Sequence, residues 1–250
     1  MATLLLRLAA PLQSWGIDSK YETRDTGKEP SKSGVVGLLA AALGYRWDVD
    51  LKFLNSLNEL FFGVRVDQEG ELLRDYHIAW VKGEDHPNVT HRYYLSDAVF
   101  LVGLESPDRA YLEKLEYALR HPVFPLFLGR RSCPPSMPLV LGIRETDLMS
   151  ALRDEPWQAA DWKQTQIRKA LQRKTMRRPV SLRLVTDSLP RETGGGIIRD
   201  LPVTFNPAHR KFGWRRAVVR QNVLIDISPM EVSTVRETEH DPMAELRGGD

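Results

Sequence analysis

The sequence predicts an α+β protein built on a ferredoxin-like (RRM-like) domain, and three features of residues 1–145 lead to this prediction. Short apolar segments of strand length recur along this stretch. Two helix-like segments lie between them, and two strand-like arms with a polar tip interrupt the series. The order is therefore strand, helix, strand, hairpin, strand, helix, strand, the split βαβ pattern of ferredoxin-like folds that RNA-recognition domains share.

The first strand and the first helix come from residues 4–44. Leucines alternate with other residues over 4–8, which is typical of a strand, and the Ala10-Pro11 break ends it. A polar loop over residues 13–32 follows. Ser33 can then cap a helix that runs to Gly44, since glycine favours a helix stop.

Two central strands flank a predicted hairpin. Residues 60–66 and 98–104 are rich in β-branched and aromatic side chains, which favours strands. Between them, Leu72–Val81 and Val89–Leu95 are predicted to be the arms of a hairpin whose tip, Lys82 to Asn88, is polar. We expect this hairpin, over about residues 72–95, to protrude as a thumb.

The second half of the chain is less regular. Asp108 opens a helix that ends near His121-Pro122, and residues 139–143 supply the last strand of the ferredoxin-like series. Beyond residue 145 the sequence predicts a helix over about 158–176, strands near 180–186 and 217–225, a small C-terminal β-rich extension spanning 146–230 and a flexible tail over 231–250.

The chain is basic outside its last twenty residues. Residues 231–250 hold six acids and two arginines, a net −4 against the +2 of the whole chain, which leaves +6 for residues 1–230. Residues 162–186 contain eight lysines and arginines and no acid. Such a run attracts phosphates through counterion release, although a solvated helix face is the alternative. The role of the basic run over 161–178 therefore stays open.

Composition excludes several classes of protein. A lone Cys133 leaves no partner for an internal disulfide or a multi-cysteine zinc site, which agrees with a reducing compartment. No segment approaches the roughly 20 apolar residues that span a bilayer. Arg7 breaks the opening run of leucines, unlike the apolar core of a signal peptide. We therefore expect a cytoplasmic protein with no cofactor and no membrane contact.

The sequence also lacks the usual catalytic groupings. Six histidines are scattered singly, and there is no His-x-His pair or Gly-x-Ser-x-Gly elbow. RNA cleavage without a metal needs a base for the 2′-hydroxyl and an acid for the leaving oxygen, placed together. The sequence thus predicts no catalytic residue, no metal site and no enzyme.

Two segments near the N-terminus supply candidate RNA-binding residues. Lys32, Ser33 and Gly34 lie at a predicted helix N-terminus, where free N–H groups and the helix dipole attract a phosphate. An ordinary N-cap is the alternative there. Gln13 and Trp15 follow the first strand, where unpaired bases can stack on an indole and be read by an amide. Core packing is the alternative for the tryptophan.

Arginines and the hairpin supply further candidates. Arg24 lies in a loop with lysines nearby, and an ion pair with a neighbouring acid is its alternative. Arg130 and Arg131 follow Gly129, and their planar forks suit phosphates and guanine edges. A core salt bridge is the alternative for one of the two. The hairpin candidates are His91, Arg92 and Tyr93. The hairpin can wedge between two parts of an RNA strand while its aromatic rings support bases. A subunit-contact arm is the alternative, and both roles can hold at once.

Three segments together identify a family. The first combines Arg7–Gly16 with Thr23-Arg24 and Pro30–Leu38, the second is Tyr93–Val102, and the third is Pro125–Pro135. In order and spacing they resemble the Cas-five family of the RAMP superfamily, in particular its type I-E branch, the CasD subunits. A further stretch of resemblance, from Arg199 to Val218, adds Arg199, Arg210 and Arg215 as candidate RNA-binding residues.

The resemblance implies a non-catalytic subunit of the type I-E Cascade surveillance complex. Such a subunit holds the 5′ handle of the crRNA, contacts the terminal CasC backbone subunit and docks the large subunit CasA. Target DNA within the complex is a further candidate partner.

Two alternative functions stay open. Relatives in type I-C systems cut precursor crRNA without a metal, using a Tyr, His and Lys set. A generic single-stranded RNA-binding domain is the other alternative. The residues that this chain offers for cleavage are Tyr21, Lys32, His91 and Tyr93.

Overall fold

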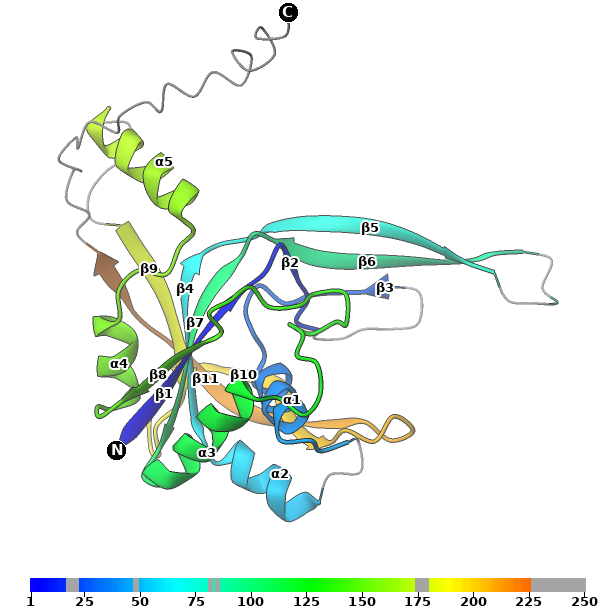
Figure 1. Cartoon of the computed structure of the whole chain (residues 1–250), viewed down its shortest axis with the longest axis horizontal. Helices are drawn as coiled ribbons and strands as arrows, with labels where there is room; N and C mark the ends of the chain where they lie inside the picture. The colour runs from blue at the N-terminus through cyan, green and yellow to red at the C-terminus, as the bar shows by residue number, and fades with distance from the viewer. Residues whose placement is uncertain (17–22, 47–49, 81–82, 84–85, 174–179, 226–250) are drawn as a thin grey trace, which may run out of the picture.

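The computed structural model describes residues 1–16, 23–46, 50–80, 83, 86–173 and 180–225 (Figure 1). Several predicted features lie outside the described residues: Tyr21, residues 82, 84 and 85 of the hairpin tip, the end of the basic run and the tail over 231–250. No helix in the described part is long and apolar enough to cross a membrane. The elements are β1 (Ala2–Ala9), β2 (Leu12–Gln13), β3 (Thr23–Arg24), α1 (Lys32–Ala42), α2 (Leu51–Asn58), β4 (Phe61–Gln68), β5 (Glu71–Ala79), β6 (Asn88–Ser96), β7 (Val99–Ser106), α3 (Arg109–Arg120), β8 (Val140–Arg144), α4 (Leu148–Asp154), α5 (Asp161–Gln172), β9 (Val180–Asp187), β10 (Gly196–Thr204) and β11 (Lys211–Ile225).

The main sheet has seven strands in the order β10-β11-β9-β4-β7-β1-β8, and neighbouring strands are antiparallel throughout. Four of them, β8-β1-β7-β4, come from the first 145 residues, with α1 between β1 and β4 along the chain and α3 between β7 and β8. The three C-terminal strands continue the same sheet, because β9 pairs with β4 through Gly63, Val64 and Arg65. The chain is thus a mixed α+β protein with a large antiparallel sheet.

Alternation along β1 divides the core between the two faces of this sheet. Leu4, Leu6 and Leu8 belong to a cluster that includes buried residues of α1, α2 and α3. Leu5 belongs to a second cluster, with residues of α4 and with Leu171 from α5. In Figure 1, α4 and α5 accordingly lie on the left of the sheet and the other helices on its right.

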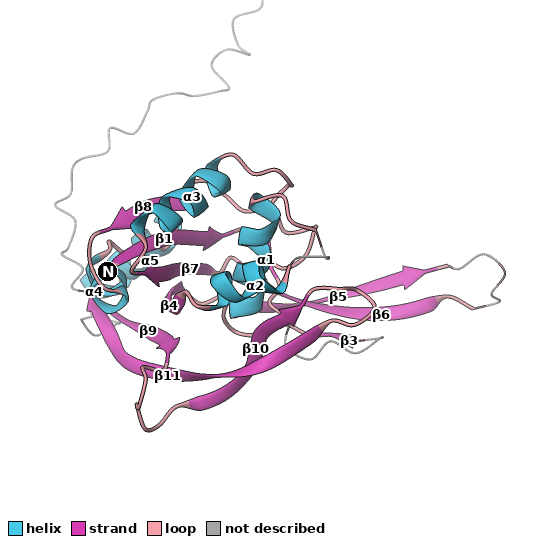
Figure 2. Cartoon of the chain, turned by 90° about the horizontal axis from the view of Figure 1, so that it is seen from below, coloured by secondary structure: helices cyan, strands magenta, loops and turns pink. Residues whose placement is uncertain are grey.

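The predicted hairpin is confirmed as β5 and β6, which pair in register from Glu71 with Ser96 to Ala79 with Asn88. β6 also pairs with β2 and, in parallel, with β3, so the hairpin is the long part of a second, four-stranded sheet. Figures 1 and 2 both show it extending well beyond the main sheet, as expected for a thumb.

Several elements differ from the sequence prediction. α1 begins at Lys32 and its N-cap is Ser31 instead of Ser33, because the Ser31 hydroxyl accepts the backbone N–H of Gly34. The helices α2 and α4 have only eight and seven residues, too few for a clear helical period, and the prediction lacks both. The prediction also lacks strand β10, which begins at Gly196.

A buried arginine joins the end of α4 to the main sheet. Nε and Nη2 of Arg65 donate to the two carboxylate oxygens of Asp67 at 2.6 and 2.7 Å. Its other donors reach the carbonyl oxygens of Leu152, Glu155 and Pro156, so all five guanidinium N–H groups are satisfied. Burial raises the pKa of the Asp67 carboxyl, against the opposing hydrogen bond and charge of Arg65. This ion pair therefore fixes where α4 ends on the second face.

Candidate nucleic-acid interface

A groove of 770 Å³ opens between β3, α1, the loop over 127–130 and the turn that joins β10 to β11. Figure 1 shows α1 and β3 on the side of the main sheet from which the thumb extends. The groove is lined by Ser14, Trp15, Gly16, Arg24, Ser31, Ser33, Gly34, Gly37, Leu38, Ala40, Ala41, Tyr45, Arg46, Phe127, Gly129, Arg130, Phe205, Pro207, Arg210 and Phe212.

The lining of the groove is basic and aromatic. Arg24, Arg46, Arg130 and Arg210 all contribute to it, and among the described residues no aspartate or glutamate does. Guanidinium groups bind phosphates, and aromatic rings provide surfaces on which unpaired bases stack. The rings available here are those of Tyr45, Phe127, Phe205 and Phe212.

Arg130 is held in place by contacts that leave part of its guanidinium free. Its Nη2 donates to the carbonyl oxygen of Arg24 at 2.7 Å, and its Cζ lies 4.6 Å from the ring centroid of Tyr94. Its Nη1 is buried and has no partner within the described residues. Burial alone would raise the pKa of Tyr94, but hydrogen bonds with Ser132 and Arg130 lower it overall. An anion in the groove would satisfy the free donor.

A glycine allows the loop that carries Arg130 to touch the end of the first strand. Gly129 has a φ of +86°, and a Cβ added there would lie 1.6 Å from the carbonyl oxygen of Ser14. The Ser14 N–H in turn donates to the Leu128 carbonyl oxygen at 3.1 Å. Only glycine fits this close backbone contact, which explains the glycine before the two arginines.

Of the other predicted loop arginines, Arg24 and Arg131 are exposed. Arg24 lies in β3, beside the thumb strand β6, and lines the groove. Its side chain has no ion pair with a described residue, so the structure gives no support to its pairing with Asp25. Arg131 has no side-chain partner in the described part of the chain and does not line the groove. Arg24 is therefore part of the groove lining and Arg131 is not.

The structure corrects the prediction for Gln13 and Trp15. The Gln13 amide is fully buried and donates to the carbonyl oxygens of Leu8 and Ala98 at 3.2 and 2.7 Å. Its Oε1 accepts the indole N–H of Trp15, which is 1% exposed. A Cβ at Gly34 would lie 2.8 Å from the Trp15 ring, so that glycine makes room for the indole. Trp15 therefore packs in the core, which is the alternative that the sequence left open.

The anion at the N-terminus of α1 is a side chain of the protein itself. The backbone N–H of Lys32 donates to Oδ2 of Asp200 at 2.8 Å. Its ammonium is buried and donates to Asp187 Oδ2 and to the Leu60 carbonyl oxygen, both at 2.8 Å. Burial lowers the pKa of Lys32, and the charge of Asp187 opposes this. Lys32 is therefore not available to a phosphate. Ser33, whose hydroxyl lies 3.3 Å from that of the capping Ser31, lines the groove together with Gly34.

Arg215 is also a structural residue, contrary to prediction. Its Nε and Nη2 donate to both carboxylate oxygens of Asp200 at 2.6 and 2.8 Å, and its Nη1 donates to Asp187 at 2.8 Å. Burial alone would lower the pKa of Arg215, but the two carboxylates raise it above its usual value. No donor of this guanidinium faces the groove.

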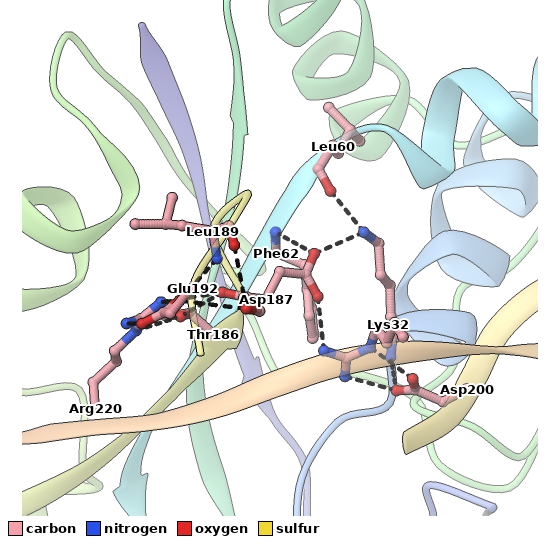
Figure 3. A network of polar contacts seen from close by, with 11 residues as sticks. Lys32, Leu60, Phe62, Thr186, Asp187, Leu189, Glu192, Asp200 and Arg220 are labelled. Carbon is pink, nitrogen blue, oxygen red and sulfur yellow. Dashed lines mark hydrogen bonds and ion pairs between the residues drawn. The ribbon is translucent and has the colours of Figure 1, made fainter. Parts of the chain in front are cut away.

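These residues belong to a larger polar network that joins five elements (Figure 3). Asp187 at the end of β9 also accepts the Phe62 N–H of β4 at 3.1 Å, and Arg220 of β11 contacts Thr186 and Glu192. The network fixes β10 and β11 against the start of α1. It thereby fixes the groove wall formed by Phe205, whose ring lies 3.8 Å from a Cβ built at Gly37.

Of the remaining predicted residues, all but Arg210 lie outside the groove. His91, Arg92 and Tyr93 are half-buried on β6, where Arg74 donates to His91 at 3.3 Å and the Tyr76 ring lies 5.5 Å from it. Arg199 is exposed on β10, with its Cζ 5.8 Å from the ring of Trp214. Arg210 is the one member of this group of predicted residues that lines the groove.

Sequence reasoning missed several groove residues. Arg46 and Tyr45 directly follow the helix stop at Gly44, and a basic-aromatic pair at that position is a signal that was available. Phe127, Phe205 and Phe212 lie in segments that carry the family resemblance, but the sequence does not show that they approach α1, because this depends on the pairing of distant strands.

A basic, aromatic groove beside a long hairpin defines a candidate single-stranded nucleic-acid interface. The family model described as "CRISPR-associated protein (Cas_Cas5)" matches residues 3–218. The chain therefore belongs to this Cas-five family, as its sequence motifs indicate.

Individual relatives agree with the family. The CRISPR system Cascade subunit CasD of Escherichia coli (strain K12) is 40% identical over 157 residues, which cover 56% of this chain and 70% of that protein. A solved structure described as "Crystal structure of Cas protein" has a TM-score of 0.66 and 36% identity, and covers 91% of this chain and 100% of its own. A chain of a "CRISPR RNA-guided surveillance complex" has a TM-score of 0.65 and 29% identity, with 89% and 91% covered.

Proposed function

We propose that this chain is a non-catalytic crRNA-binding subunit of a type I-E Cascade surveillance complex in the cytoplasm. Its groove would hold the 5′ handle of the crRNA, with phosphates on Arg24, Arg130 and Arg210 and unpaired bases on the nearby rings. The single observation that carries the proposal is a groove lined by four arginines and no described acid. The CasD relative and the surveillance-complex chain support the assembly.

The domain organisation forms part of the proposal. We propose a ferredoxin-like domain over 1–145, with the thumb at about 72–95 and a C-terminal extension over 146–230. The antiparallel order β8-β1-β7-β4, with one helix after β1 and one after β7, supports the ferredoxin-like interpretation.

The thumb is the proposed contact with the CasC backbone subunit, and the chain would link that backbone to the large subunit CasA. One face of β5 carries exposed apolar side chains: Leu72 is 66% exposed, Tyr76 56% and Ile78 54%. Trp80, just beyond the strand, is 69% exposed. Exposed apolar residues gathered on one arm are typical of a protein interface. His91, Arg92 and Tyr93 on the paired strand are proposed to meet the RNA where it passes the thumb.

The test replaces groove arginines and compares them with arginines outside the groove. Arg130→Ala with Arg210→Ala should lower the crRNA content of the complex purified from cells that express all its subunits. The matched control is Arg153→Ala with Arg216→Ala, two exposed arginines that do not line the groove. Charge-assisted contacts to phosphate are worth about 1.5–3 kcal/mol each, so the loss should be large. Equal crRNA content in both variants would contradict the proposal.

A further inference from the structure

The basic helix α5 lies away from the groove, on the other face of the main sheet. Ile167 and Leu171 pack into the cluster that contains Val180, Leu182 and Leu5, whereas α1 packs in the cluster on the opposite face. Figure 1 shows α5 on the far side of the sheet from the thumb. A strand held in the groove is therefore separated from α5 by the sheet.

This packing turns a basic stripe of α5 toward solvent. Trp162, Gln166, Lys169 and Arg173 follow one another at intervals of three or four residues, so they share one side of the helix, and all four are exposed. None of the four lines the groove or the smaller cavity beside Ile167. The stripe therefore faces solvent and belongs to neither of these two cavities.

The cations of α5 are not neutralised by carboxylates within the described part of the chain. Lys163 Nζ lies 5.7 Å from the Trp162 ring centroid and donates to the Gln166 amide at 3.1 Å. Arg168 donates to Gln164 at 3.4 Å, and its Nε is buried without a described partner. Neither these two residues nor the two cations of the stripe form an ion pair with a described carboxylate. By contrast, the carboxylates of the polar network neutralise Lys32 and Arg215.

We propose that α5 is a second nucleic-acid contact, which binds the phosphate backbone of duplex DNA without reading its sequence. The exposed stripe is not part of the aromatic groove that is proposed to hold unpaired bases, so it fits a partner that carries phosphates outside and bases stacked inside. Lys169 and Arg173 are four residues apart, about 6 Å along the helix, and can reach phosphates of one strand together. This site is separate from the proposed groove function.

The experiment measures binding of the full chain to a labelled DNA duplex by fluorescence anisotropy over a range of NaCl concentrations. The test variant is Lys169→Gln with Arg173→Gln. The control of equal charge is Lys52→Gln with Lys114→Gln, which are exposed on α2 and α3. Each lost phosphate contact should flatten the slope of log K against log salt by about 0.9, so the test variant should lose about 1.8. The control should keep the original slope, and thermal unfolding checks that both variants fold.

Single-stranded RNA separates this site from the groove. The α5 variant should bind labelled single-stranded RNA like the original chain, whereas Arg130→Ala with Arg210→Ala should weaken RNA binding and keep the duplex slope. The proposal is overturned if the control variant and the test variant change duplex binding equally. It is also overturned if neither of these two variants changes it. Unchanged duplex binding together with loss of an acidic protein partner from the purified complex would also overturn it, in favour of protein docking.

Discussion

At the scale of single residues, the protein depends on four buried charges that cancel. Lys32 and Arg215 carry the positive charges, and Asp187 and Asp200 the negative ones. Each carboxylate accepts at least three hydrogen bonds from the two cations and nearby N–H groups. Such a cluster is stable only as a whole, because removing one member leaves a charge buried without its partner.

Asp200→Ala should therefore destabilise the protein strongly. The change removes the bidentate partner of Arg215 and the acceptor at the start of α1, and breaking a buried pair costs about 3–5 kcal/mol. Urea unfolding of the variant measures this as a fall in the free energy of unfolding. Asp154→Ala, at an exposed position, is the control and should stay within about 0.5 kcal/mol of the original. A fall of less than about 1 kcal/mol for Asp200→Ala would show that the cluster is not a structural joint.

Gly129→Ala should disturb the groove through its backbone. A residue other than glycine at a φ of +86° costs roughly 1–2 kcal/mol, and the added Cβ would overlap the Ser14 carbonyl oxygen. The loop must then move, so we expect weaker binding of single-stranded RNA as well as lower stability. Gly196→Ala is the matched control, since a Cβ there meets nothing within 4 Å. RNA affinity equal in the two variants would contradict the proposed position of the loop in the site.

The roles of individual arginines could be predicted only in part, for a physical reason. Arg130 and Arg210 line the groove as their chemistry suggests, yet Arg215 has the same chemistry and is neutralised inside the protein. The difference is the approach of Asp187 and Asp200, which lie 28 and 15 residues away along the chain. Sequence spacing does not reveal this approach, because strand pairing creates it.

At the scale of elements, the thumb contributes to the core of its own chain at the base of β6, through Tyr94 and Leu95, and not along β5. Its first strand pairs with β6 and is exposed over most of its length, with Leu72 and Tyr76 open to solvent. A hairpin of this kind can be shortened without exposing buried surface, because loop closure depends only weakly on loop length.

Deleting residues 82–88 should leave a folded protein that assembles poorly. We expect a melting temperature within about 4 °C of the original, which corresponds to about 1 kcal/mol or less for a chain of this size. Recovery of the backbone subunit after co-expression should fall, since the tip extends the proposed contact surface. Differential scanning calorimetry and affinity purification measure the two effects. Normal assembly and interference with the tip removed would show that the thumb has another role.

Elements with a repeated sequence pattern could be predicted. Very short helices, and a strand that follows a glycine run, could not. The alternating leucines of β1 and the two long arms of the thumb each carry a repeated signal over eight or nine residues. The helices α2 and α4 bury only two or three residues each, too few to repeat a pattern. Strand β10 begins at Gly196 after two glycines with positive φ, and a glycine run predicts a loop whether or not a strand follows.

At the scale of the whole molecule, the basic groove predicts strong salt dependence of RNA binding. Each phosphate neutralised on a single strand contributes about −0.7 to the slope of log K against log salt. Four arginines line the groove, so the slope for single-stranded RNA should approach about −2.8 if each of them contacts a phosphate. Arg130→Ala should make the slope less steep by about 0.7, as measured by titrations at several salt concentrations. Binding that does not depend on salt would contradict a phosphate-binding groove.

From the arrangement of the whole molecule we also predict that the chain binds RNA without cleaving it. An acid and base pair is typically worth about 10²–10⁴-fold in rate, and it would have to reach the RNA proposed to lie in the groove. Within the described residues no histidine lines the groove; His77 contacts Asp75 and His91 contacts Arg74, both on the thumb.

The residues that sequence offered for cleavage are separated in the same way. Lys32 is buried against Asp187, Tyr93 lies on the thumb, and Tyr21 lies outside the described part of the chain. We therefore expect that a labelled repeat hairpin, incubated with the purified chain in EDTA, is bound and stays intact on a denaturing gel. Tyr94→Phe and His91→Ala are the variants to compare, because the Tyr94 ring centroid lies 4.6 Å from Cζ of Arg130 and His91 lies on strand β6 of the thumb. A single discrete product from the original chain, lost in either variant, would place the protein among metal-independent endoribonucleases.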